Sequence, residues 1–381
     1  MQLPSYCRGC GIPLQVEKPD QPGYIPPEAL TRKSKLCQRC YRILHYGKNE
    51  EAIVEREFYI QAIKRALKEA ELVVQVFDII DFEGSFSEEL HELIGTKPLV
   101  TAVTKIDLLP QQVTIKETED WVWYRFKDLG LMPKAVIPVS SAKGWGIKKL
   151  LETIQLLAGK KRLAAVAGVT NVGKSSLLNA LRRRAGDGVK NKRRSQSNSP
   201  ALTTSSYPGT TRGIVRVDLP TAGVTLLDTP GIVPRSRISD LLCPDCNQKL
   251  IPAGELSRKT FKLIAGQSLL FGGIVEFAIK GGVQRPILMS FAARGVVFHS
   301  TTTQRVPELI ARHAGDWLVP PCKKCDIGRW KKIKVEVNEG EDLVIPGLGW
   351  ISIRRGPVEM EIKLPEDVKT IVRKALVAPE K

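Results

Sequence analysis

A glycine-rich loop between an apolar strand and a helix constrains this chain more than any other feature. The loop runs Gly168-Val169-Thr170-Asn171-Val172-Gly173-Lys174-Ser175, between the apolar run 162–167 and a helical segment that begins at Ser176. The spacing G-x-x-x-x-G-K-S turns backbone amides inward around phosphate oxygens at a helix N-terminus. We expect Lys174 to reach the β- and γ-phosphates and Ser175 to bind Mg²⁺, with Asn171, Val172, Gly173 and Ser176 completing the nucleotide contacts. The loop predicts a bound nucleotide without saying which one.

The charge balance points to a polyanionic partner. The chain has 381 residues, with 58 Lys and Arg against 40 Asp and Glu, a net charge of +18. Nucleic acid is the leading candidate for such a partner, and surplus cations that serve solubility alone are the alternative. The length favours two or three domains. No apolar run approaches the roughly 20 residues that span a bilayer. We therefore expect a cytoplasmic protein that neither spans nor binds a membrane.

All eight cysteines occur as C-x-x-C pairs, which in a reducing compartment indicates metal ligation. The pairs are Cys7/Cys10, Cys37/Cys40, Cys243/Cys246 and Cys322/Cys325. The first two pairs predict a four-thiolate zinc module, with a redox dithiol as the alternative. The last two are separated by residues 247–321 but can meet in space to form a second zinc site. Unmetallated thiols or separate sites remain the alternative for this second set.

The segment before the glycine loop predicts a parallel α/β sheet. Apolar strand runs alternate with helical periodicity, and polar loops follow the strands. The expected strands are 72–77, 98–103 and 135–139, and the expected helices are 58–72, 113–127 and 147–157. In such a sheet, the loops after the strands gather at one edge.

Two of those loops specify guanine. Thr104-Lys105-Ile106-Asp107 follows the second strand and matches the guanine-reading pattern [N/T]-K-x-D. Asp107 can accept two hydrogen bonds from the guanine N1 and N2 donors, which adenine lacks, while Lys105 packs along the base. Ser141-Ala142-Lys143 follows the third strand and is expected to close the edge of the ring. Both motifs in one domain with a glycine loop predict a guanine nucleotide.

Two segments downstream carry the hydrolytic chemistry. Asp228-Thr229-Pro230-Gly231 follows an apolar strand; Asp228 would hold Mg²⁺ through water, and the Gly231 amide would face the γ-phosphate. Pro208-Gly209-Thr210-Thr211 precedes another strand. Thr211 would complete the Mg²⁺ shell in the triphosphate state, with Thr210 as the competing residue. We expect Lys174, Thr211, Asp228 and Gly231 to form the catalytic set.

Basic segments and the C-terminal region suggest how a partner is bound. Cations and aromatic residues interleave over 33–48, and residues 182–194 form a basic arm that we expect to be flexible and to contact RNA backbone. A solvated basic face without function is the alternative for both. Short apolar strands and glycine-rich turns from residue 235 predict a mostly β domain that ends in a short helix after Pro365. We therefore divide the chain into a four-cysteine zinc module (1–50), a GTPase domain (51–235) and a β-rich domain (236–381).

The order of the motifs resembles one family. T-K-I-D and S-A-K precede G-V-T-N-V-G-K-S, P-G-T-T and D-T-P-G, a circular permutation of the usual GTPase order. With the flanking cysteine pairs and β-rich domain, the chain is similar to the YqeH family of bacterial GTPases. That resemblance implies GTP hydrolysis coupled to assembly of the small (30S) ribosomal subunit, and a C-terminal domain suited to RNA. It also implies slow hydrolysis, because Ile232 stands where many GTPases carry a catalytic Gln. Asn171 matches an asparagine that coordinates K⁺ in related GTPases; a side chain that only braces the loop is the alternative.

The sequence therefore predicts a GTPase with GTP or GDP, Mg²⁺, Zn²⁺ and K⁺ as its ligands. Its expected partners are rRNA and the 30S subunit or its precursor, and we expect a monomer that does not bind DNA. The competing hypothesis is an RNA-binding scaffold in which the nucleotide is mainly structural.

Overall fold

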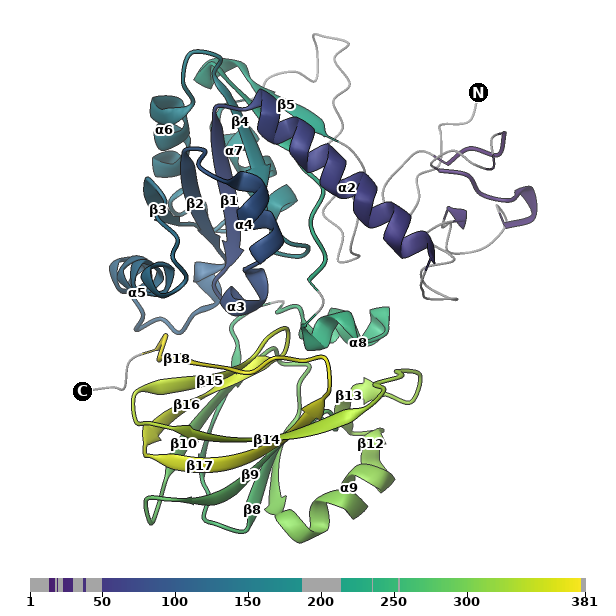
Figure 1. Ribbon diagram of the computed structural model, residues 1–381, viewed down its shortest axis with the longest axis vertical. Coiled ribbons are helices and arrows are strands. Elements are labelled where there is room, and N and C mark those ends of the chain that lie inside the picture. The colour runs from purple at the N-terminus through teal and green to yellow at the C-terminus, as the bar shows by residue number, and fades with distance from the viewer. Residues whose placement is uncertain are drawn as a thin grey trace. The chain divides into compact units, whose positions relative to one another are not determined.

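The computed structural model describes residues 14–17, 19, 23–29, 37–38, 50–186, 214–234, 236–252 and 254–377 (Figure 1). The chain divides into two compact units. The first unit takes in residues 1–77, 87–104 and 131–233, and the second takes in 78–86, 105–130 and 234–381. The second unit thus contains two segments that the sequence analysis assigned to the GTPase domain, namely 78–86 and 105–130.

A six-stranded sheet forms the centre of the first unit. Its order is β3-β2-β1-β4-β6-β5. The strands are β1 (Leu72–Asp78), β2 (Leu99–Thr104), β3 (Ala135–Pro138), β4 (Leu163–Ala167), β5 (Val215–Leu219) and β6 (Val224–Asp228). The pairs β2–β3, β1–β4 and β4–β6 are parallel, and β5 at the edge pairs antiparallel with β6. The strand that precedes the glycine loop is therefore flanked by β1 and by the strand that precedes D-T-P-G.

Helices cover both faces of this sheet because its strands are apolar on both sides. The helices are α2 (Glu50–Glu69), α4 (Glu88–Ile94), α6 (Ile147–Leu157) and α7 (Lys174–Arg184). Leu72, Val74 and Val76 share a core with α6 and α7, whereas Val73 lies with α2 and α4 in a second core. The alternation follows from the period of two in a strand, which sends successive side chains to opposite faces. The result is a three-layer α/β arrangement.

The second unit contains two antiparallel five-stranded sheets. Their orders are β18-β15-β16-β10-β7 and β11-β8-β9-β17-β14. The strands of the first are β7 (Ser257–Lys262), β10 (Ile287–Ala292), β15 (Glu341–Ile345), β16 (Gly349–Arg355) and β18 (Ile371–Lys374). Those of the second are β8 (Gln267–Phe271), β9 (Val275–Gly282), β11 (Phe298–Thr302), β14 (Trp330–Val337) and β17 (Val358–Pro365). One core joins side chains of both sheets, including Leu288, Ile351, Phe277 and Ile362. This β-sandwich bears out the expectation of a β-rich C-terminal region.

Short elements complete the second unit. They are α3 (Phe82–Ser85), α5 (Ile115–Asp128), α8 (Pro244–Leu250), α9 (Val306–His313), β12 (Ala314–Gly315) and β13 (Leu318–Cys322). Thr114 caps α5, because its hydroxyl accepts from the Glu117 amide and the Glu117 carboxylate accepts from the Thr114 amide, a capping box.

The expectation of a C-terminal helix after Pro365 is wrong. Residues Ile371–Lys374 instead form β18, which pairs antiparallel with β15. The run Thr370-Ile371-Val372 is β-branched, and such side chains fit a pleated sheet better than a helix. Among the described residues, no helix is long and apolar enough to cross a membrane.

Candidate nucleotide and metal sites

The glycine loop lies between β4 and α7, as the sequence predicts. Gly168 has no room for a side chain, since a Cβ there would lie 2.7 Å from the Val76 carbonyl oxygen of β1. Gly173 has a φ of +92° at the start of α7, a conformation that favours glycine. Lys174 is buried, and its Nζ donates to the carbonyl oxygens of Gly168 and Val169 at 3.0 and 2.9 Å. The backbone carbonyls of the glycine loop thus hold the buried Lys174 ammonium group in place.

Asn171 adopts a left-handed backbone conformation, with a φ of +68°. Asparagine tolerates this region better than most residues with a side chain. The loop geometry therefore supplies a backbone reason for asparagine at this position, in addition to the ligand role that the sequence suggests.

The D-T-P-G segment lies against the glycine loop within the first unit. The Thr229 hydroxyl donates to the Val166 carbonyl oxygen at 3.0 Å, and the Thr170 amide donates to the Ile232 carbonyl oxygen at 2.9 Å. A Cβ at Gly231 would lie 2.9 Å from the Lys174 Nζ and 3.0 Å from the Thr170 amide nitrogen. Only glycine leaves this space open beside the ammonium group.

The donor set of this edge fits a hard divalent cation. Asp228, the last residue of β6, is fully buried, and Ser175 is the second residue of α7, after Lys174. A carboxylate and a hydroxyl are oxygen ligands of the kind that Mg²⁺ prefers. Ile232 is 4% exposed and packs with Leu227 in the core, so its side chain offers no polar group to this edge.

A hydroxyl joins the T-K-I-D loop to the glycine loop. The Thr104 Oγ1, at the end of β2, lies 2.6 Å from the Val172 carbonyl oxygen and 3.0 Å from that of Phe77. Threonine stands here in place of the commoner Asn of N-K-x-D, and it makes this connection.

Lys105 and Asp107 follow Thr104. Lys105 has a φ of +63°, and its Nζ contacts the Asp78 carboxylate at 2.5 Å. Asp107 is half-buried in a short 3-10 helix (Ile106–Leu108).

The loop after β3 is closed by Ser140. The Ser140 Oγ accepts from the Lys143 amide at 2.9 Å, and the Ser140 amide donates to the Trp145 carbonyl oxygen at 3.0 Å. Ala142 and Lys143 are exposed at the tip. The Ser141 Oγ is buried and has no hydrogen-bond partner among the described residues.

Several predicted residues lie outside the part of the chain that the structure describes. They are Thr210, Thr211, Cys7, Cys10, Cys40 and the basic arm from residue 187 onward. Of the first cysteine set, only Cys37 is described, and it is buried.

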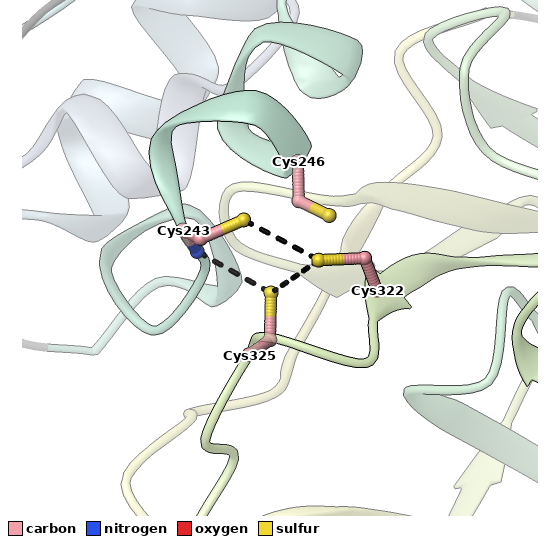
Figure 2. Close-up of side chains that lie close together, drawn as sticks. All are labelled: Cys243, Cys246, Cys322 and Cys325. Carbon is pink, nitrogen blue, oxygen red and sulfur yellow. Dashed lines mark hydrogen bonds between the residues drawn. The ribbon is translucent and has the colours of Figure 1, made fainter. Parts of the chain in front are cut away.

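The second cysteine set forms a compact cluster. Cys243 and Cys246 flank the first turn of α8, while Cys322 ends β13 and Cys325 lies in the turn that follows. Figure 2 shows the four side chains pointing toward one another, and all four Sγ atoms lie within 4.8 Å of one another. Cys243 Sγ is 3.5 Å from Cys322 Sγ, and Cys322 Sγ is 3.8 Å from Cys325 Sγ. The structure therefore brings together residues that stand far apart in the sequence, at a site able to hold a metal ion.

The electrostatics of the cluster favour one thiolate. Burial opposes ionisation of Cys322, but a backbone hydrogen bond from Lys324 and contacts with the other thiols lower its pKa to about 7. Burial raises the pKa of Cys246 and of Cys325 in the absence of a metal charge. The Cys243 amide donates to Cys325 Sγ at 3.4 Å, a bond that would stabilise a ligating sulfur.

Sequence reasoning missed the residues that hold these loops in place. Asp78 binds Lys105, Ser140 closes the S-A-K loop, and Thr229 ties D-T-P-G to β4. The only sequence feature that could have pointed to these residues is that each is a polar residue at or just after the end of a buried strand.

Comparisons with known proteins found family models that match two parts of this chain and a relative that matches most of its length. Residues 163–247 match the family described as 50S ribosome-binding GTPase, and residues 285–376 match the family described as YqeH-like, C-terminal. The chain is 29% identical to the uncharacterized protein YqeH of Bacillus subtilis, over 97% of this chain and 99% of that protein. It is 27% identical to NO-associated protein 1 of Arabidopsis thaliana, over 92% of this chain and 69% of that protein. A solved structure of GNP-bound YlqF from T. maritima is 25% identical, with a TM-score of 0.30, over 50% of this chain and 63% of that one.

The motif order, the sheet and the GTPase family match define a circularly permuted GTPase. GTP or GDP and Mg²⁺ are the ligands of this class. More narrowly, its C-terminal region matches the YqeH-like, C-terminal family, and the chain is similar over nearly its whole length to YqeH of Bacillus subtilis.

Proposed function

We propose that this GTPase acts in assembly of the small ribosomal subunit and binds its precursor and rRNA according to nucleotide state. The observation that carries the proposal is the permuted motif set, combined with a YqeH-like C-terminal domain in one chain. The net charge of +18 supports an RNA partner. The protein is proposed to work as a cytoplasmic monomer, with the four-cysteine zinc module at 1–50, the GTPase domain at 51–235 and the β-rich domain at 236–381.

The nucleotide roles follow from the loops. Asp107, Lys105 and the loop Ser141–Lys143 bind the guanine base. The glycine loop from Asn171 to Ser176 binds the phosphates, with Lys174 on their outer oxygens and the Gly231 amide toward the γ-phosphate. Ser175, Asp228 and Thr211 would hold Mg²⁺, which when bound neutralises charge on the phosphate oxygens. The burial of Lys174 and Asp228 supports this assignment, because a dry site strengthens each of these interactions.

Hydrolysis is proposed to be slow without help. Ile232 is buried among apolar side chains and cannot orient a water molecule. We propose that K⁺ bound near Asn171 stimulates the reaction, as the ribosomal particle does. Single-turnover GTP hydrolysis in K⁺ and in Na⁺, each with and without small-subunit particles, tests this. A faster rate in K⁺ or with particles supports the proposal, and one unchanged low rate in all conditions favours the scaffold.

Both cysteine sets are proposed to bind zinc. For Cys7, Cys10, Cys37 and Cys40 the support is the motif spacing alone. For Cys243, Cys246, Cys322 and Cys325 it is geometry, since a tetrahedral ion with Zn–S bonds of about 2.3 Å sets its sulfurs about 3.8 Å apart. The two distances of 3.5 and 3.8 Å between sulfurs lie close to that value. Four thiolates leave no open position, so the second zinc is proposed to be structural.

A further inference from the structure

The lysine of the base-reading loop is held by a residue outside any recognised motif. Lys105 Nζ contacts the Asp78 carboxylate at 2.5 Å, and the other carboxylate oxygen accepts from the Ile80 amide at 2.9 Å. Both side chains are largely buried, at 22% exposed for Lys105 and 8% for Asp78. An ion pair shielded from water holds its geometry better than an exposed one. Asp78 therefore fixes the direction of a side chain that is expected to pack along guanine.

The loop that follows Asp78 is closed on itself. Ser85 Oγ accepts from the Asp78 amide at 3.0 Å and donates to the Asp81 carbonyl oxygen at 2.7 Å. A Cβ at Gly84 would lie 2.3 Å from Asp81 Oδ2, so this turn needs glycine. The Ser85 hydroxyl thereby links Asp81 to Asp78 within a single tight turn.

The β-sandwich holds the same loop at Asp81. The Gly347 amide, in the turn between β15 and β16, donates to Asp81 Oδ1 at 2.9 Å, and Arg237 Nη1 lies 4.0 Å from the other oxygen. Arg237 is itself held by Asp240 at 2.8 Å. All these residues belong to the second unit.

A second carboxylate of this loop, that of Glu83, is more deeply buried and contacts two arginines. Arg125 of α5 donates to both its oxygens at 3.0 and 3.2 Å, and Arg373 of β18 lies 3.4 Å away. Arg373 also lies 3.5 Å from Asp342 of β15, and its guanidinium stacks 4.7 Å from the Trp121 ring. The four charged side chains are at most 8% exposed. Removing one member of such a network leaves an uncompensated buried charge, so the arrangement resists change.

We propose that Asp78 is a positioning residue for Lys105 and that the β-sandwich controls it through Asp81 and Glu83. The affinity for guanine nucleotides is then set in part by the sandwich. Because the base is common to both nucleotides, this coupling changes GDP and GTP affinity equally and leaves the chemical step alone. By thermodynamic reciprocity, filling the base site stabilises the sandwich contacts, and a partner bound to the sandwich alters nucleotide affinity. The inference rests on the proposed role of Lys105 at the base.

Variants of the full-length protein test the coupling. Asp78→Asn and Glu83→Gln are each expected to weaken binding of GDP and of a non-hydrolysable GTP analogue by one common factor, about fivefold or more. KM for GTP rises by the same factor while kcat is unchanged. Asp120→Asn, on the exposed face of α5 where Asp120 pairs only with solvent-exposed Lys116, changes neither constant. Ile362→Ala, a cavity in the sandwich core, lowers the melting temperature without changing nucleotide affinity.

Wild-type protein supplies a test that does not depend on folding of the variants. GDP binding is expected to slow hydrogen exchange of backbone amides in β15 and β18. No change in exchange there, or folded variants with unaltered affinity, would overturn the inference, as would an effect confined to GTP. Wild-type protein that binds no guanine nucleotide would instead refute the proposed function.

Discussion

The Thr104 hydroxyl lies 2.6 Å from the Val172 carbonyl oxygen and so connects the T-K-I-D loop to the glycine loop. Both residues are buried. Thr104→Val removes the donor and leaves a buried carbonyl unsatisfied, which we expect to lower the free energy of unfolding by about 1–3 kcal/mol. We also expect weaker GDP binding. Thr104→Ser keeps the hydroxyl and serves as the control in denaturant titrations; equal stability of the Val variant and wild type would contradict this role.

Asp107 is expected to determine base specificity. Asp107→Asn replaces one acceptor oxygen with a donor amide, which suits the oxygen at C2 of xanthine instead of the guanine amino group. GDP affinity should fall by about 100-fold or more, since each hydrogen bond to a charged group contributes about 1.5–3 kcal/mol. Titration with fluorescent GDP, XDP and ADP measures the change. Retained preference for GDP over XDP in the variant, or equal wild-type affinity for ADP, would remove the guanine assignment.

Gly231 is expected to distinguish the triphosphate from the diphosphate. In Gly231→Ala the added methyl group lies 2.9 Å from the Lys174 Nζ, so the ammonium group and the backbone amide cannot both keep their places. Affinity for a GTP analogue and the single-turnover hydrolysis rate should fall at least about tenfold, the effect of losing one charge-assisted hydrogen bond. GDP affinity should fall less than GTP affinity, because GDP lacks the γ-phosphate that the Gly231 amide would face and depends only on the contact of Lys174 with the β-phosphate. A rate equal to that of wild type would show that Gly231 does not face the γ-phosphate.

Two zinc ions per chain are expected by elemental analysis of the purified protein. Cys322→Ser with Cys325→Ser should remove one equivalent and lower the melting temperature, because the metal would join α8 to the turn after β13. The matched control, Cys7→Ser with Cys10→Ser, removes the other equivalent and leaves the spectrum of a Co²⁺-substituted second site unchanged. Two equivalents retained in the Cys322/Cys325 variant would show that the cluster holds no metal.

Much of the GTPase region could be predicted because its signals are local. Strands that are buried on both faces read as continuous apolar runs, and the motif residues directly follow them. This is why the expected strand 72–77 and helix 147–157 agree with Leu72–Asp78 and Ile147–Leu157. The cluster of Cys243/Cys246 with Cys322/Cys325 could also be predicted, because the C-x-x-C spacing is typical of metal ligands even when the chain between the two pairs is long.

The contacts that join loops to the β-sandwich could not be read from the sequence. Arg373 meets Glu83 across 290 positions, and neither residue belongs to a motif. Nothing local distinguishes Arg373 from a solvated cation near the end of the chain. Its burial depends on Asp342 and on the Trp121 ring, and both come from distant segments.

The central claim is a nucleotide-controlled attachment to the assembling small subunit, and co-sedimentation tests it most directly. Full-length protein is centrifuged with small-subunit precursors in the presence of a GTP analogue, GDP or no nucleotide, over a series of salt concentrations. We predict that the analogue increases the bound fraction over GDP, that salt decreases it steeply, and that Asp107→Asn abolishes the difference between nucleotides. Equal binding in all three nucleotide states would contradict the account.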